Sequence, residues 1–464
     1  MTSCQKEVAE VANPPQEFKP NGNEILTTEK LIGEDKQHSS FEKAIDDGLG
    51  NFYFAGYINE QNVIGKIDKQ GFIIWQKSIN FKVNEIVLFY GAGNLEKSAL
   101  IVGNDGNRAV VAIYDRNGTK LSDAYFNDFA INTFNDVRYR HTATNYYLCS
   151  AIGGAGNSEN DISPYWVNFT ISSNGQISKA IPNVNLPAQI RLTQYPRIRF
   201  NKFANVVNTV TFFDSQPIPN TLTYTLEAYI SYSERDTEGK ILSAGMFAFN
   251  DEITYKPQLN SSGGDITKTD LKFIWQRSVG GQTPNAQIFL GKSIVIGNEI
   301  TVVGSAQSTD KKTNASVGFF SAAKIVVLNK SGSIVSNREF SISQYSDIIS
   351  DINLIIPKYS IIGYDNNGNP ILQKEDDFDE GVYICGTVSN YTKDQDYFYG
   401  YGWIAEISSG SIGKSRYFGF PSGRHYFNRL VVTGQNIYVF GFKNYFIKGG
   451  GHKAWFAQIN RNGL

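Results

Sequence analysis

The chain has 464 residues, of which 41% are hydrophobic and 19% are charged, as is ordinary for a globular protein. Its 43 basic and 44 acidic residues nearly cancel, so the charge gives no reason to expect nucleic acid or an anionic membrane surface as a partner. Three cysteines, and four histidines without ligand spacing, exclude a disulfide framework and a closed zinc site, and we expect no metal and no cofactor.

The N-terminal segment resembles the cleavage site of a bacterial lipoprotein. A small residue, Ser3, precedes Cys4, which would carry the lipid. Residues 7–23 are polar and contain three prolines, which is typical of an extended tether. A signal peptide, however, needs a basic start and an apolar region of about 7–15 residues before the cysteine. The alternative is therefore a free cysteine in a polar tail. We expect residues 1–23 to form a flexible tether and residues 24–464 a single domain.

A four-residue turn ending in glycine recurs seven times along the chain. Six of the seven begin with Asp, Asn or Ser, whose short side chains hydrogen-bond the turn backbone, and the glycine allows the left-handed conformation that follows. This is the chemistry of a hairpin turn between two antiparallel strands. The turns are residues 68–71, 115–118, 172–175, 236–239, 329–332, 407–410 and 460–463.

A short, very apolar segment ending in a small residue precedes each turn. Apolar residues on both faces predict a strand buried between two sheets. The copies are residues 52–56, 100–103, 147–150, 300–304, 382–386 and 437–441, with a degenerate copy around 206–213. Cys149 and Cys385 lie just before the small residue of their copies. If the repeats are blades 3 and 6 of a ring, the two cysteines lie on opposite sides of it, too far apart for a disulfide. We therefore expect both thiols to be buried and free.

The spacing of these segments predicts the fold. Gly56, Gly103 and Ser150 are 47 residues apart, and such a period, with several strands in each unit, is the signature of propeller blades. A further repeat, IWQKS at 74–78 and IWQRS at 274–278, marks outer strands, although the second copy does not follow a turn glycine and leaves 251–281 the weakest region. We predict an all-β, β-propeller fold of about seven four-stranded antiparallel blades; the alternative is a pair of β-sandwiches.

The turn at 68–71 leading to Trp75 resembles the repeats of quinoprotein-type propellers and of uncharacterised propeller lipoproteins of Gram-negative bacteria.

The pattern also raises the question of how the ring closes. The last turn ends at Gly463, one residue before the chain stops, so no outer strand remains for the last blade. Residues 24–33 are rich in β-branched and apolar types. We predict that they pair antiparallel with 454–459 and close the ring.

Aromatic residues of the last two blades are the candidate ligand surface, because exposed aromatic rings stack on sugars or anchor proteins. Alternation along 397–401 also fits a plain buried strand, which is the simpler interpretation. Acidic residues at 375–380, after 365–369, suggest either a calcium loop or, in the simpler interpretation, a solvated loop. The candidate surface residues are Tyr391, Tyr397, Tyr399, Tyr401, Trp403, Tyr426 and Tyr445.

Two classes of function remain. The first is an exported, lipid-anchored, non-catalytic binding or scaffold protein of the cell envelope, in the periplasm or on the outer-membrane surface, with a protein or carbohydrate ligand. It would be a monomer that touches the membrane only through its anchor. The second is a propeller enzyme of the quinoprotein-dehydrogenase-like type, which the resemblance would imply, acting at the central funnel with converging charged groups and a cofactor-stacking Trp. No catalytic motif is visible in the sequence, which favours the first class.

Overall fold

The structure, a computed structural model, describes residues 20–91, 95–126, 133–141, 147–155, 163–178, 184–185, 198–199, 210–212, 222–235, 241–257, 264–280, 288–307, 321–342, 346–355, 359–364, 370–374, 380–392, 397–408, 410–420, 423–445 and 451–464. Strands dominate these residues, and the two helices described are single 3-10 turns, η1 (Asn23–Ile25) and η3 (Arg461–Gly463). No described helix is long and apolar enough to cross a membrane.

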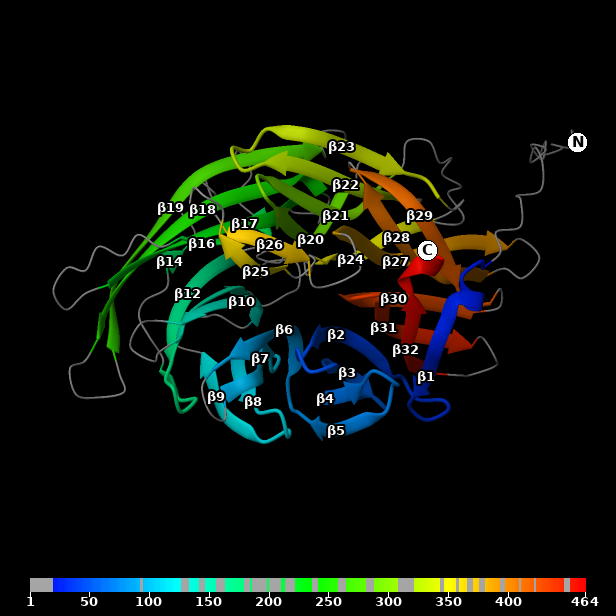
Figure 1. Ribbon diagram of the computed structural model, residues 1–464, viewed down its shortest axis with the longest axis horizontal. Helices are drawn as coiled ribbons and strands as arrows, with labels where there is room; N and C mark the ends of the chain where they lie inside the picture. Colours follow the sequence, from blue (N-terminus) through cyan, green and yellow to red (C-terminus); the bar gives the residue numbers. More distant parts are fainter. Residues whose placement is uncertain are drawn as a thin grey trace, which may run out of the picture.

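The first three blades each consist of antiparallel strands that follow one another in sequence from the centre of the ring outward (Figure 1). Blade 1 contains β2 (Ser40–Asp46), β3 (Asn51–Ile58), β4 (Gln61–Asp68) and β5 (Ile73–Ser78). Blade 2 contains β6 (Lys82–Tyr90), β7 (Glu96–Asn104), β8 (Ala109–Tyr114) and β9 (Lys120–Phe126). Blade 3 contains β10 (Thr133–His141), β11 (Tyr147–Ala155), β12 (Ser163–Ile171) and β13 (Ile177–Ser178), with β14 (Val184–Asn185) also paired to β12.

The remaining blades follow the same plan with insertions. Blade 4 contains β15 (Ile198–Arg199), β16 (Val210–Phe212) and the long strands β17 (Leu222–Arg235), β18 (Ile241–Pro257) and β19 (Gly264–Gly280). Blade 5 contains β20 (Ile288–Ile296), β21 (Glu299–Gln307), β22 (Ser321–Asn329) and β23 (Ile334–Phe340). Blade 6 contains β24 (Ser346–Ile355), β27 (Gly381–Thr392), β28 (Tyr397–Ser408) and β29 (Ser411–Phe418), with the hairpin β25 (Tyr359–Tyr364) and β26 (Pro370–Lys374) between its first two strands.

Blade 7 brings the two ends of the chain together. It contains β30 (Gly423–Thr433), β31 (Asn436–Tyr445) and β32 (His452–Asn460), and its outer strand is β1 (Leu26–Ile32). The antiparallel register runs from Leu26 opposite Ile459 to Ile32 opposite Ala454. The predicted pairing of the N-terminal segment with residues 454–459 is confirmed, with β1 a little shorter than the predicted 24–33. The described residues thus form seven blades of a β-propeller, rather than a pair of sandwiches.

The core lies between neighbouring blades, because the middle strands are apolar on both faces. All six residues of β8 are buried, and one apolar cluster joins β7 and β8 to β11 and β12 of the next blade. An equivalent cluster at the closure packs Phe41 and Phe54 of blade 1 against Phe440 and Phe456 of blade 7. The ring is therefore continuous from blade 7 to blade 1.

The predicted turns connect the third and fourth strands of most blades. Gly71, Gly118, Gly175, Gly332 and Gly410 all have positive φ, between 69° and 85°. The carboxylate of Asp68 accepts hydrogen bonds from the backbone N–H groups of Gln70 (2.9 Å) and Phe72 (2.8 Å), as the turn chemistry requires. Residues 236–239 differ: this segment connects β17 to β18, the second and third strands of blade 4, and itself lies outside the described residues.

The repeated tryptophan is explained by packing against the next blade. Trp75 lies on the outer strand β5, covers the turn glycine Gly118 and donates a hydrogen bond to the carbonyl of Arg116 (3.0 Å). Trp275 on β19 does the same with Gly332 and the carbonyl of Lys330 (2.8 Å). The region around 251–281 is therefore the outer part of blade 4, and the second IWQ segment is an outer strand as predicted.

Cys149 and Cys385 are both buried and free, as predicted. Their positions are not equivalent, however. Cys385 precedes Gly386 and lies opposite Asp351, whereas Cys149 lies opposite Tyr139, and the glycine of blade 3 that corresponds to Gly386 is Gly153. The prediction that Ser150 is the small residue of this copy was wrong, because the corresponding glycine, Gly153, lies three residues later. The strand β11 continues to Ala155.

Candidate functional site

A β-bulge interrupts the innermost strand of most blades at one recurring position. In β2, β6, β10, β24 and β30, one extra residue lies opposite the end of the second strand. The residue facing the start of each bulge is a glycine: Gly56, Gly103, Gly153, Gly386 and Gly441. A Cβ added to any of them would lie within 2.0 Å of a carbonyl oxygen of the bulged strand. The small residue that ends each apolar segment is therefore required by the bulge.

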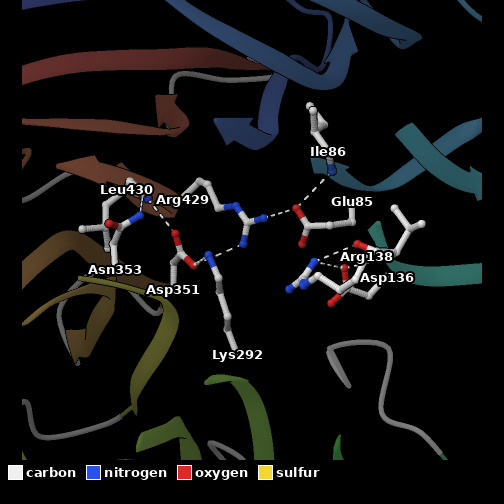
Figure 2. Close-up of polar contacts among 10 residues, drawn as sticks. Glu85, Ile86, Asp136, Arg138, Lys292, Asp351, Asn353, Arg429 and Leu430 are labelled. Carbon is white, nitrogen blue, oxygen red and sulfur yellow. Dashed lines mark hydrogen bonds and ion pairs between the residues drawn. The ribbon is translucent and has the colours of Figure 1, made fainter. Parts of the chain in front are cut away.

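The residue directly after each bulge is charged and faces the centre of the ring. The five are Lys43, Glu85, Asp136, Asp351 and Arg429. In blade 5 the irregularity spans Leu290 to Ser293, and Lys292 takes the corresponding place. The corresponding segment of blade 4 lies outside the described residues. We call these six residues the axial ring; neighbouring inner strands contact one another around it, and Figure 2 shows five of its members turned toward one another.

Arg429 is the central member of the axial ring. Its Nη2 contacts Glu85 of blade 2, and its Nη1 lies 3.2 Å from Asp351 Oδ1 of blade 6. Lys292 of blade 5 binds the same Asp351 oxygen at 2.9 Å, and the other oxygen of Asp351 accepts the N–H of Leu430 at 2.9 Å. Arg429, Glu85 and Asp351 are all buried. One guanidinium thus connects three blades, including two that are not neighbours.

Asp136 has a different environment. Its Oδ1 accepts hydrogen bonds from Arg138 Nη1 (2.6 Å) and from the N–H of Val137 (2.7 Å), while Oδ2 is buried without a partner among the described residues. Burial, with the nearby Glu85 charge, raises the pKa of Asp136 to about 7. Burial would also raise the pKa of Glu85, but Arg429 and Lys43 lower it to about 2. The pKa values of these two carboxyl groups are therefore shifted in opposite directions, that of Asp136 upward and that of Glu85 downward.

Two nitrogen donors of the axial ring have no acceptor in the described residues. No hydrogen bond or ion pair is described for the ammonium of the half-buried Lys43, and burial lowers its pKa. Arg429 Nε is buried and also unpartnered. Their surroundings are polar, because Glu85, Asp351 and Glu42 all act electrostatically on Lys43. The axial ring therefore combines a neutralised ion-pair network with unsatisfied hydrogen-bond donors.

The extra residues of the bulges hold adjacent blades together. Asn84 of blade 2 donates from Nδ2 to Thr133 Oγ1 (2.9 Å) and to the carbonyl of Phe134 (2.8 Å) in blade 3. Asn428 of blade 7 makes the matching contact with the carbonyl of Phe41 (2.9 Å) in blade 1. The contact at the closure therefore repeats one inside the ring, so the bulges both fix the blade interfaces and present the charged residues to the axis.

Comparison with known proteins identifies no family for this chain. No protein-family model matches the chain, and no curated protein matches its sequence. Solved structures similar in fold include Drosophila Plexin A in complex with Semaphorin 1b (8% identity, 94% of this chain and 87% of that one, TM-score 0.39). They also include polysaccharide lyase Uly1 (9%, 94% and 100%, TM-score 0.41) and B. megaterium levansucrase (12%, 75% and 85%, TM-score 0.34). These likenesses are too distant to indicate a function.

The predicted aromatic surface is partly wrong. Tyr401 and Trp403 are 1% and 0% exposed and pack in the core between blades 5 and 6, so they cannot contact a ligand. Tyr426 is half-buried and stacks on Phe442 with ring centroids 4.7 Å apart. The side chains of Tyr391, Tyr397, Tyr399 and Tyr445 lie outside the described residues, as do Cys4 and the acidic segments 365–369 and 375–379. The described residues contain no cluster suited to a metal ion.

A cavity of about 410 Å³ lies at the closure, beside β1. Its lining includes Glu29, Phe420 and Lys443, and the ammonium of Lys443 binds Glu29 while lying 4.3 Å from the ring centroid of Trp455. These groups satisfy one another and attach β1 to blade 7. We therefore assign the cavity to the closure and take the axial ring as the candidate functional site.

Proposed function

We propose that this protein is a non-catalytic β-propeller binding protein of the bacterial cell envelope, exported and anchored by a lipid on Cys4, with a protein or a carbohydrate as its ligand. One observation carries the non-catalytic part: each axial carboxylate is already held by a cation, either a member of the ring or, for Asp136, the neighbouring Arg138. Glu85 binds Arg429, Asp351 binds Arg429 and Lys292, and Asp136 binds Arg138. Buried ion pairs of this kind favour one arrangement of the blades over others.

A funnel enzyme is the second candidate, and the difference between the pKa values of Asp136 and Glu85 favours it. Two nearby carboxyl groups with pKa values of about 7 and about 2 could serve as an acid and a base. The quinoprotein-like version also needs a tryptophan against the cofactor. All five tryptophans are engaged elsewhere: Trp75 and Trp275 cover turn glycines, and the others, Trp166, Trp403 and Trp455, are buried in the core. Binding is the better supported function.

Lipid attachment is tested by expressing the full-length gene product in a Gram-negative host with a radiolabelled fatty acid. We expect label and membrane fractionation for the natural chain and for the control Cys149→Ser, and neither for Cys4→Ser. Label that survives Cys4→Ser, or no label on the natural chain, would contradict the anchor.

The binding role is tested on a glycan array and by recovering any bound glycan for mass spectrometry. A binding protein returns its ligand unchanged after long incubation. A ligand that comes back cleaved or oxidised, with the change lost in Asp136→Asn, would assign the protein to the enzyme class instead.

A further inference from the structure

We propose that the axial ring binds one small oxyanion, a carboxylate or a phosphate, between Lys43, Lys292 and Arg429. This proposal rests on the proposed function in one respect: it treats the axis as a binding site and not as a catalytic one. Nothing in the comparisons assigns a ligand to this place.

The unfilled hydrogen-bonding capacity of the ring consists mostly of donors. Lys43 offers an ammonium with no described acceptor, and Arg429 offers a buried Nε–H with none. A buried donor without an acceptor costs about 1–3 kcal/mol, and more when it is charged. Among the ring's carboxylate oxygens, Asp136 Oδ2 is the buried one left unpartnered in the described residues. A ligand that supplies acceptor oxygens would satisfy these groups, whereas a cation would not.

The charge balance also favours an anion. The ring together with Arg138 holds four cations, Lys43, Arg138, Lys292 and Arg429, and three carboxylates, Glu85, Asp136 and Asp351. Glu42 lies beside Lys43 and adds a fourth carboxylate, but its Oε1 already accepts from Ser40 Oγ (2.7 Å) and Asn428. Four cations thus face four carboxylates, and the raised pKa of Asp136 shifts this balance toward positive charge. Burial lowers the pKa of Lys43, and a bound anion would favour its charged form.

Asp136 makes the binding dependent on pH. In its protonated form its unpartnered Oδ2 can donate a hydrogen bond to an oxyanion, whereas the ionised form would repel one. Burial raises the pKa of Asp136 and lowers the pKa of Lys43, so binding of an anion should take up protons at these two groups, and affinity should fall as the pH rises. The other titratable groups facing Asp136 are Glu85, Arg138 and Arg429. Glu85 is already ionised and the two arginines stay charged, so none of them changes its charge in this range.

The ring is reachable from solvent on one side. The side chains of Arg138 and Lys292 are 24% and 21% exposed, whereas their partners Asp136 and Asp351 are fully buried. The two cations thus lie between the buried carboxylates and the solvent. Lys43 is also half-buried, so an approaching anion would meet these three cations before it reached the buried Arg429.

The test is isothermal titration of the full chain with sodium glucuronate, inorganic phosphate and, as the neutral control, glucose. We expect saturable one-to-one binding of at least one anion and none of glucose; phosphate without glucuronate, or the reverse, identifies which oxyanion the site prefers. For a carboxylate, whose own ionisation does not interfere, titrations in HEPES and Tris at pH 7 should reveal proton uptake. No binding of either anion at 10 mM, or equal binding of glucose, would overturn the proposal.

Two variants separate binding from folding. Lys43→Met removes a half-buried cation with no described partner, so we expect the melting temperature to be unchanged or raised while anion affinity falls at least about tenfold. Lys272→Met is the matched control, because Lys272 lies on a surface pair with Glu252 away from the ring, and it should bind as the natural chain does. Asp136→Asn should bind with less proton uptake. Unchanged affinity in Lys43→Met would contradict the site, while the membrane and turnover tests above decide the proposed function separately.

Discussion

Removal of β1 should open the ring, and the cost can be worked out from the structure. β1 pairs with β32 at six positions, from Leu26–Ile459 to Ile32–Ala454. At a net contribution of about 0.5–1.5 kcal/mol for each hydrogen bond, the ladder stabilises the closure by about 3–9 kcal/mol. Its loss would also leave Lys443, which binds Glu29 and is nearly buried, without its carboxylate. Since a domain is stable by only about 5–15 kcal/mol, deletion of residues 1–33 should unfold or aggregate the protein.

The matched control is deletion of residues 1–19. The cut belongs there and not at residue 23, because the N–H groups of Asn21 and Gly22 donate to the carbonyl of Tyr417 on β29 (3.1 and 2.9 Å). We expect the shorter deletion to melt within a few degrees of the full chain by circular dichroism. The longer one should show a broad, low transition or aggregate by size-exclusion chromatography. If both truncated chains melted alike and stayed monomeric, β1 would not close the ring.

Three further predictions follow from the packing. Gly103→Ala should destabilise the chain by more than about 3 kcal/mol in urea unfolding, because the added Cβ would lie 1.8 Å from the carbonyl oxygen of Lys82. Gly106→Ala is the control: its Cβ would meet no atom within 4 Å, so the change removes only a positive-φ glycine and should be milder. Trp275→Phe should lower the free energy of unfolding by about 1 kcal/mol, because it removes the hydrogen bond to the carbonyl of Lys330. An unchanged free energy of unfolding would mean that this hydrogen bond contributes nothing to stability. Burial lowers the pKa of His425 from 6.5 to about 3, so the folded state binds fewer protons than the unfolded state between these values and loses stability as the pH falls through that window. The stability advantage of the natural chain over His425→Gln should therefore shrink by about 2 kcal/mol from pH 7 to pH 5. This difference measurement cancels the opposite contributions of Asp136 and Asp251, two buried carboxyl groups whose pKa values burial raises.

The blade repeat and its closure were predictable because they depend on local chemistry. A turn that begins with Asp or Asn and ends in Gly needs little more than its own residues, and Asp68 and Gly71 behave as their types require. The closing strand was predictable from residues 24–33, which precede the first blade and are rich in β-branched and apolar types. The second inference also uses the requirement that every strand edge inside a sheet find a partner.

The axial ring was not predictable in the same way, because its members come from six blades and lie far apart in sequence. Glu85 and Arg429 are 344 residues apart, and neither belongs to a recognisable motif. A signal did exist in the glycines that end the apolar strands, since Gly103 and Gly441 leave no room for a side chain beside the bulges that turn Glu85 and Arg429 inward. The aromatic prediction failed at Tyr401 and Trp403 because alternation along a strand does not tell which face is covered by the next blade.

The central claim is that charged residues of separate blades meet at the axis, and a double-mutant cycle between Glu85 and Arg429 tests it most directly. The two lie in blades 2 and 7, which contact each other there only if the ring closes as described. We compare urea unfolding of the natural chain, Glu85→Gln, Arg429→Met and the double variant. The structure predicts a coupling free energy of at least about 1.5 kcal/mol. Each single variant leaves its partner's charge buried and unpaired, so the double variant should lose less stability than the two single variants lose together. Additive effects, within about 0.5 kcal/mol, would contradict the axial ring.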